Sequence, residues 1–280
     1  MPRRLCAVLA VLSFGCGGHY RPAVPSEHED VHAARRYPGL ANLSDDEASG
    51  YLIEHPFETP DHVKIIREGG LPSHCIDVLA RAQWRQDVVL AFWAPAHFDN
   101  CRFRDSLEYI GSELSLAEQA VASRKRDDAL VALGRALHGI QDFYAHSNYV
   151  ELMAEKYGDF AAVPIVPVWR ADGVKAVDQL AAAKLVSGHV WWESGDQCTV
   201  PEQSHAALNK DSAKSPSGAS VVDRWSMTKY RAARELAEKA TRQYLHDELA
   251  RPGWSDLLSD CQGFVGYTIS LDNRRETDRP

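Results

Sequence analysis

Apolar side chains recur every three or four residues through most of this chain, and this spacing restricts what it can fold into. The pattern is strongest over residues 127–157, where Leu130, Leu133 and Leu137 fall on one side of a helix. The alternation of apolar and polar residues that is typical of strands is nearly absent. With 280 residues, of which 45% are hydrophobic, the chain can bury a sizeable core. The sequence therefore predicts an all-α fold.

Other segments repeat the helical spacing and outline one domain. They are 71–92, 103–123, 174–185 and 222–249. Residues 59–61, Thr-Pro-Asp, are typical of a helix start, because proline is tolerated in the first turn and aspartate can cap it. We expect a helical domain over 59–250, with a polar linker over 19–58 before it and a tail over 251–280 after it.

The first 18 residues are expected to be a secretory signal and not part of the fold. Arg3 and Arg4 make a basic start, and the apolar run over 5–14 is too short to cross a bilayer. The residues before Cys16 also resemble a bacterial lipobox, which would make Cys16 the lipidated first residue of a lipoprotein. Plain secretion and lipid anchoring both stay open, and either predicts a bacterial protein that is secreted or held in the cell envelope.

Export would place the remaining cysteines in an oxidising compartment, where disulfides persist. None of these four cysteines forms a Cys-x-x-Cys pair, which argues against a cysteine zinc site. The simplest pairing joins Cys75 to Cys101 and Cys198 to Cys261. Two other pairings and buried free thiols are the alternatives.

The composition excludes several classes of function. Lys and Arg number 31 and Asp and Glu 39, so the net charge is −8, and the chain lacks the basic surface of a dedicated nucleic-acid-binding protein. It also lacks a Gly-rich phosphate loop and a Gly-x-Ser-x-Gly motif, which argues against a nucleotide-binding fold and a serine hydrolase.

The strongest predicted helix carries His138, Asp142 and His146 at positions i, i+4 and i+8. At about 100° per residue these side chains drift only about 80° around the helix, so all three project from one side. Two imidazoles and a carboxylate are unfavourable on a face that points into the core, but they are ligands that zinc binds readily. A polar surface stripe is the alternative interpretation. The pattern favours a metal site.

The run over 137–151, Leu-His-Gly-Ile-Gln-Asp-Phe-Tyr-Ala-His-Ser-Asn-Tyr-Val-Glu, resembles the signature of heterokaryon-incompatibility C-like proteins. These are relatives of the bacterial zinc-dependent phospholipases C and of the single-strand-specific zinc nucleases. Two weaker stretches, 97–101 and 204–211, support the resemblance, which covers about 61–211. It implies an all-α enzyme that holds a cluster of zinc ions in a cleft between helices.

The resemblance also implies roles for single residues. His138 and Asp142 match a helical pair that binds one zinc together with His97 and an upstream carboxylate, for which Asp87 is the candidate. Asp142 matches a carboxylate that bridges two metal ions and is thereby part of the catalytic centre. Asp99, close to His97, is expected to act as a base or to orient another group.

A separate zinc site is implied around His146, with ligands that usually follow a His-x3-Glu spacing. His189 and Glu193 have this spacing. His205 lies in the stretch that is more similar to the family, with Asp211 as its oxygen donor. We favour His205 and Asp211 and keep the other pair as the alternative.

A third zinc site is implied by His62, which resembles an early histidine ligand of the phospholipases. Their amino-terminal Trp completes that site, whereas here no Trp precedes Trp84, so two or three zinc ions are expected. The resemblance thus implies a zinc-dependent phosphodiester hydrolase, similar to phospholipase C, that uses zinc-activated water. Its substrate would be a phospholipid or another phosphodiester, at a membrane surface, with no dedicated nucleic-acid partner. A zinc nuclease and a non-catalytic metal-binding interaction protein of the same fold are the alternatives.

Overall fold

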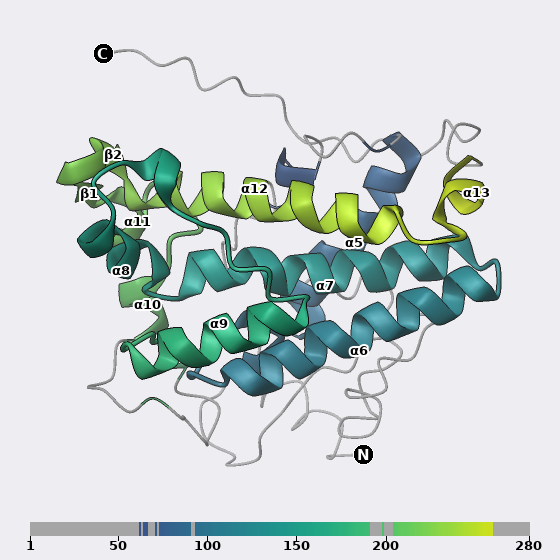
Figure 1. Cartoon of the computed structure of the whole chain (residues 1–280), viewed down its shortest axis with the longest axis horizontal. Coiled ribbons are helices and arrows are strands. Elements are labelled where there is room, and N and C mark those ends of the chain that lie inside the picture. The colour runs from purple at the N-terminus through teal and green to yellow at the C-terminus, as the bar shows by residue number, and fades with distance from the viewer. Residues whose placement is uncertain are drawn as a thin grey trace, which may run out of the picture.

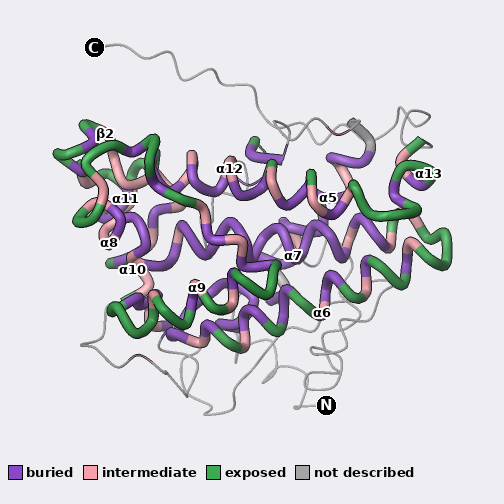
Figure 2. The backbone as a smooth tube through the Cα atoms, in the orientation of Figure 1, coloured by how far each residue is buried: buried purple, intermediate pink, exposed green. Residues whose placement is uncertain are grey.

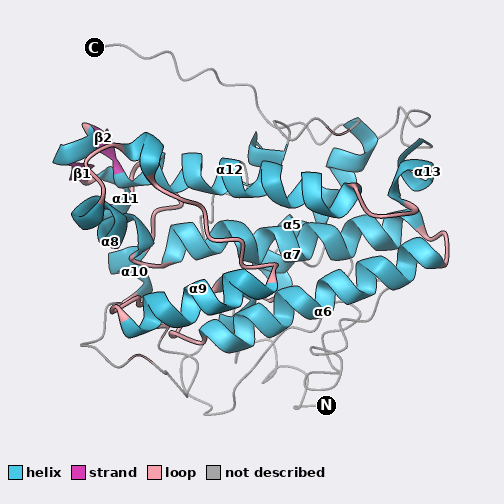
Figure 3. Cartoon of the chain, viewed as in Figure 1, coloured by secondary structure: helices cyan, strands magenta, loops and turns pink. Residues whose placement is uncertain are grey.

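The structure of this chain is a computed structural model. It describes residues 62, 64–66, 71, 73–90, 93–190, 198 and 204–259. The expected signal, Cys16, the linker over 19–58, Glu193 and Cys261 all lie outside these residues. Helices dominate the described part, and its named strands form one short hairpin (Figure 3). The predicted all-α fold is confirmed.

Helix α7 (Arg126–His146) runs through the middle of the domain (Figure 1). Helices α6 (Phe103–Ala122) and α12 (Lys229–Leu249) lie along opposite sides of it, and α5 (Ser73–Val89) packs against its far side in this view. From Ala129 onward α7 is buried along almost its whole length (Figure 2). A helix that is apolar on most sides belongs inside a bundle, so the segment with the strongest periodicity becomes the central helix.

Charged and hydroxyl side chains fix where the long helices begin. The first turn of α7 carries Asp127 and Asp128, and that of α6 carries Asp105, so negative charge meets the positive end of each helix dipole. At the start of α12, the hydroxyl of Thr228 accepts a hydrogen bond from the backbone N–H of Arg231 at 3.2 Å. This cap satisfies a donor that has no partner within the helix.

The predicted helix over 127–157 is wrong in one respect, because it is broken between α7 and α8 (Tyr149–Lys156). Ser147 is extended, with φ −99° and ψ 164°, and its hydroxyl donates to the carbonyl of Phe143 at 2.5 Å. A serine side chain that bonds the preceding turn competes with helix continuation. His146 therefore sits at the carboxyl end of α7, where backbone carbonyls can accept bonds from other segments.

The predicted helix over 222–249 begins late, at the start of α12. The residues before it form an antiparallel hairpin of β1 (Val221–Val222) and β2 (Met227–Thr228), joined by the 3-10 helix η3 (Asp223–Trp225). In this hairpin Val221 pairs with Thr228. β-branched residues favour strands, and the Thr228 cap marks the true start of the helix.

The remaining elements cover the ends and one side of the bundle. They are η1 (Ala94–His97), η2 (Phe160–Ala162), α9 (Ala171–Ala182), α10 (His205–Leu208), α11 (Pro216–Ala219) and α13 (Trp254–Ser259). Helices α8, α10 and α11 gather with the hairpin at one end of α7, and α13 lies at the other end (Figure 1). Among the described residues, no helix is both long and apolar enough to cross a membrane.

Cys101 and Cys198 form a disulfide with a Cα–Cα distance of 5.0 Å. The predicted pairing of Cys75 with Cys101 and of Cys198 with Cys261 is therefore wrong, although Cys75 is disulfide-bonded as well. That prediction paired neighbours along the sequence, whereas the fold brings residue 198 to the turn that precedes α6. A disulfide indicates an oxidising compartment.

Candidate metal centre

Nine histidine and aspartate residues meet where α5, η1, α7 and the α10 segment come together. They form four groups of three, three of which share residues, and within each group the possible ligand atoms lie within 4.8 Å of one another. We call these nine residues the His/Asp cluster. Its groups are His62–Asp87–His138, His97–His138–Asp142, His62–Asp142–Asp211 and Asp99–His146–His205. The cluster contains every residue that the sequence analysis named as a ligand or catalytic group, apart from the alternative pair His189 and Glu193.

Asp142 lies at the centre of the cluster and is completely buried. Its Oδ2 atom lies 2.9 Å from Nδ1 of His97 and 2.9 Å from Nε2 of His138. The other oxygen, Oδ1, lies 3.5 Å from Nε2 of His62. Within the described residues, Oδ1 accepts no hydrogen bond. A carboxylate whose two oxygens face different imidazoles is placed to bridge two cations.

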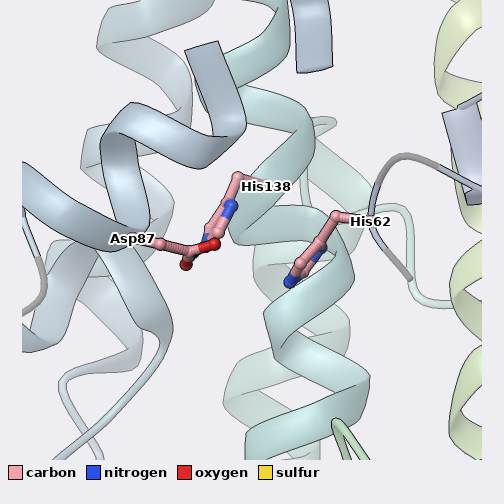
Figure 4. Close-up of side chains that lie close together, drawn as sticks. All are labelled: His62, Asp87 and His138. Carbon is pink, nitrogen blue, oxygen red and sulfur yellow. Dashed lines mark ion pairs between the residues drawn. The ribbon is translucent and has the colours of Figure 1, made fainter. Parts of the chain in front are cut away.

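The surroundings of His138 have the dimensions of a metal site. Its Nε2 atom lies 3.1 Å from Oδ1 of Asp87 and 3.3 Å from Nδ1 of His97. Figure 4 shows the Asp87 carboxylate pointing toward the His138 ring, with the ring of His62 alongside; these two rings stack with centroids 4.4 Å apart. Four ligands at about 2.0–2.1 Å from zinc stand roughly 3.3–3.4 Å apart in a tetrahedron. The nitrogen and oxygen atoms of this group therefore fit zinc in type and in spacing.

The second part of the cluster surrounds His146. Its Nδ1 atom donates to the backbone carbonyl of His97 at 2.8 Å, which leaves Nε2 facing Oδ2 of Asp211 at 3.0 Å. His205 approaches from α10, and its Nδ1 atom lies 3.0 and 3.1 Å from the two oxygens of Asp99. A backbone carbonyl on one imidazole nitrogen is the arrangement that orients the other nitrogen toward a metal.

Proton affinities in the cluster are strongly shifted. Burial by itself lowers the pKa of His138, but the negative charges of Asp142 and Asp87 raise it to about 10. Burial raises the pKa of Asp142, yet the charges of His138 and His146 hold it well below its usual range. Burial also opposes the charged form of His146, while Asp211, Asp142 and Asp99 raise its pKa well above the ordinary value. Positive charge nearby therefore stabilises these buried carboxylates, and either protons or metal cations can supply it.

The turn that carries Asp99 has an unusual backbone. Phe98, Asn100 and Cys101 have φ values of 57°, 56° and 52°, in the left-handed region that residues other than glycine rarely adopt. A neighbouring segment holds the turn, because the N–H of Asn100 donates to the carbonyl of Gly188 at 2.8 Å. Strained turns persist where the surroundings fix them, and they concentrate at functional sites.

Sequence reasoning missed Gly188, which makes this close approach possible. A Cβ atom at this position would lie 2.6 Å from Cα of His205 and 3.0 Å from Oδ1 of Asp99. Only glycine lets the segment pass between the two residues. The sequence offers no local signal for this role, since the neighbours are remote along the chain.

Two other supporting residues, Gln141 and Lys210, were also missed. Oε1 of Gln141 lies 2.5 Å from Nδ1 of His62, and its Nε2 donates to Oγ1 of Thr241 at 3.1 Å. Lys210 is buried, and its Nζ donates to the carbonyls of Ser147 and Leu208, both at 2.7 Å. Each lies next to an expected ligand in the sequence, but that position alone does not reveal its role.

His189 takes a different place from the one its spacing suggested. Among the described residues, none of the four groups includes it. Its backbone carbonyl accepts a hydrogen bond from the N–H of His205 at 2.9 Å, so it supports that residue through the main chain. His205 and Asp211 both lie in the cluster but in different groups, with Asp99 beside His205.

The fold and the cluster define a helical protein with buried His/Asp groups that could hold metal ions. Residues 73–160 match the model of the family described as the VWA7 N-terminal domain, which covers less than half of the chain. This stretch is therefore similar to that domain, and it includes the cluster residues from Asp87 to His146 but not His62, His205 or Asp211. No curated protein matches the chain, and no solved structure does.

Proposed function

We propose that this protein is a zinc-dependent phosphodiester hydrolase that acts on phospholipids, secreted or anchored in the cell envelope through Cys16. The observation that carries the proposal is the position of Asp142, fully buried, with His97 and His138 on one oxygen and His62 on the other. The resemblance of residues 137–151 to the signature of zinc phospholipase relatives supports the choice of reaction.

The residues of the cluster would hold two or three zinc ions. When bound, zinc polarises a phosphoryl oxygen and activates water for attack on phosphorus. Asp142 would supply the negative charge between the cations, and Asp87 would add to it beside His138. The bond from His146 to the carbonyl of His97 would keep its ring in the orientation that a ligand needs.

Asp99 is proposed as the group that orients or accepts a proton during the reaction. Its carboxylate is almost buried and is held in place by His205, 3.0 Å away. A carboxylate fixed by a histidine at the edge of a metal cluster can take a proton without moving. Asp211, on the other side of His146, would complete the ligand set.

The proposal is tested on the full chain, purified without chelator and analysed for metal. We expect two or three zinc ions per chain and hydrolysis of phosphatidylcholine vesicles that stops on chelation and returns with zinc. The melting temperature should fall on chelation, because a metal that binds only the folded state stabilises it. Less than about half an equivalent of zinc after reconstitution at neutral pH would contradict the proposal.

A second candidate is a non-catalytic metal-binding protein of the same fold. The complete burial of His138 and Asp142 favours it, because structural metal sites are closed to solvent. Zinc binding without hydrolysis of phosphatidylcholine, of bis(p-nitrophenyl) phosphate or of single-stranded DNA would select this candidate. Hydrolysis of the DNA alone would select a nuclease.

A further inference from the structure

A cavity of about 350 Å³, including its open mouth, lies beside the His/Asp cluster. His62 and Asp211 line one wall of it, and both belong to the group that also contains Asp142. The cavity therefore reaches the cluster from the side of α12.

Another part of the lining comes from one face of α12. Tyr230, Ala233, Arg234 and Ala237 line the cavity at positions i, i+3, i+4 and i+7. Side chains with this spacing lie on the same face of a helix, so these four residues of α12 line the cavity together. Ala233 and Ala237 are buried, and their small side chains leave the space that larger residues would fill.

Arg234 is the cation among these α12 residues, and it is partly exposed to solvent. Its Nη2 atom pairs with Oε1 of Glu238 at 3.0 Å, and 29% of its side chain is exposed. The other cation of the cavity, Lys210, is buried, and its Nζ is used by backbone carbonyls. A guanidinium presents a planar set of donors that matches the oxygens of a phosphate.

We propose that this cavity binds the substrate and that Arg234 contacts a phosphate oxygen, while Ala233 and Ala237 receive an aliphatic group of a phosphate ester. The inference rests on the proposed function for the hydrolysis that follows binding, whereas binding of the ligand does not require hydrolysis. It names a specificity-determining residue that lies outside the His/Asp cluster. The chemistry required of the ligand is one anionic phosphate and a short apolar chain.

The test measures binding by calorimetry on the zinc-loaded full chain. The probes are butylphosphonate, which cannot be hydrolysed at its carbon–phosphorus bond, inorganic phosphate, and dihexanoylphosphatidylcholine below its micelle concentration. We expect butylphosphonate to bind more tightly than inorganic phosphate. Binding of the lipid as well would identify a lipid headgroup as the source of the phosphate, and binding of butylphosphonate alone would identify a soluble ester; either result supports the cavity.

Arg234→Gln should raise the dissociation constant of butylphosphonate about tenfold or more, since a charge-assisted hydrogen bond is lost. The matched control is Arg231→Gln, on the same helix. Arg231 also pairs with a glutamate one turn on, Glu235 at 2.8 Å, but its side chain is 68% exposed and does not line the cavity. We expect the control to bind as the wild type does.

Ala237→Leu fills the cavity and should weaken binding of butylphosphonate more than that of inorganic phosphate, with zinc content unchanged. If Arg234→Gln and Arg231→Gln bind butylphosphonate equally well, the inference is wrong, whether or not Ala237→Leu folds. Hydrolysis separates this failure from that of the proposed function. If the wild type hydrolyses lipid but both arginine variants bind butylphosphonate equally well, only the inference about the cavity is wrong. If the wild type binds butylphosphonate through Arg234 but hydrolyses no lipid, only the proposed reaction is wrong.

Discussion

Nδ1 of His205 lies 3.0 Å from Oδ1 of Asp99, although 106 positions separate the two residues in the sequence. The disulfide between Cys101 and Cys198 joins the same two segments, two residues after Asp99 and seven residues before His205. The pair and the disulfide together fix one side of the candidate metal centre.

The disulfide should therefore support both stability and metal binding. Cys198→Ser opens a loop with a sequence separation of 97 residues, and we expect a loss of about 2–5 kcal/mol in the free energy of unfolding. Zinc content should fall as well, because His205 is no longer held beside Asp99. Urea unfolding and metal analysis measure the two effects, and Cys101→Ser should reproduce both. A variant with unchanged stability and zinc content would show that the disulfide does not hold the site.

Gly188→Ala should damage the centre through the backbone alone. The new Cβ would lie 2.6 Å from Cα of His205, so either segment must move, at a cost of about 1–3 kcal/mol. The control is Gly158→Ala, where a Cβ meets nothing within 4 Å. We expect lower zinc content in the first variant and wild-type zinc content in the second. Equal zinc content in the two variants would show that the site does not require glycine at position 188.

Lys210→Met should destabilise the end of α7. The change leaves the buried carbonyls of Ser147 and Leu208 without their charged donor. We expect the free energy of unfolding to fall by about 1–3 kcal/mol per unsatisfied group. Lys229→Met is the control, because Lys229 shares the partner Glu151 at 3.1 Å but is partly exposed, and such pairs contribute about 0–1 kcal/mol. Urea unfolding compares the two variants, and a smaller effect at Lys210 than at Lys229 would contradict the prediction.

Zinc binding should release protons. The pKa of His138 is raised from 6.5 to about 10, so without metal this imidazole is charged at pH 7.5 and must lose its proton to become a ligand. Zinc affinity should therefore rise with pH. The stability of the metal-free protein should instead fall as the pH rises. The stability that charged His138 contributes is complete below pH 6.5 and is lost as the pH rises toward 10.

Calorimetry at pH 7.5 in two buffers of different ionisation enthalpy counts the released protons. We expect zinc binding to release at least one proton per chain from the protein, after correction for protons that the buffer exchanges when it gives up zinc. Thermal melts of the chelated protein between pH 6.5 and 10 test the second part. Zinc binding without proton release would show that His138 is not a ligand.

The helices and the shared face of His138 and Asp142 could be predicted from the sequence because both depend on local spacing. His138 and Asp142 lie one turn apart on a helix, so their common face follows from the period of the helix alone. The break at Ser147 could not be predicted in this way. It depends on a side-chain bond to Phe143 and on pairing with Ser187, a residue that is remote in the sequence.

The outer part of the site depends on contacts that spacing does not encode. Asp99 lies beside His205 because a strained turn, Gly188 and a disulfide bring their segments together. The same contacts explain the wrong cysteine pairing, which assumed that neighbours in sequence are neighbours in space. Lys210 was missed because a lysine is seldom fully buried, and nothing local marks it as an exception.

The zinc content of Asp142→Asn tests the central claim most directly. The substitution keeps the size of the side chain but removes the charge that His97, His138 and His62 share. Asp127→Asn, the same change at an exposed position of the same helix, is the control. We predict that Asp142→Asn loses at least one zinc ion per chain and about a hundredfold or more in phosphodiesterase activity, while Asp127→Asn keeps both. Equal zinc content in the two variants and the wild type would contradict the account.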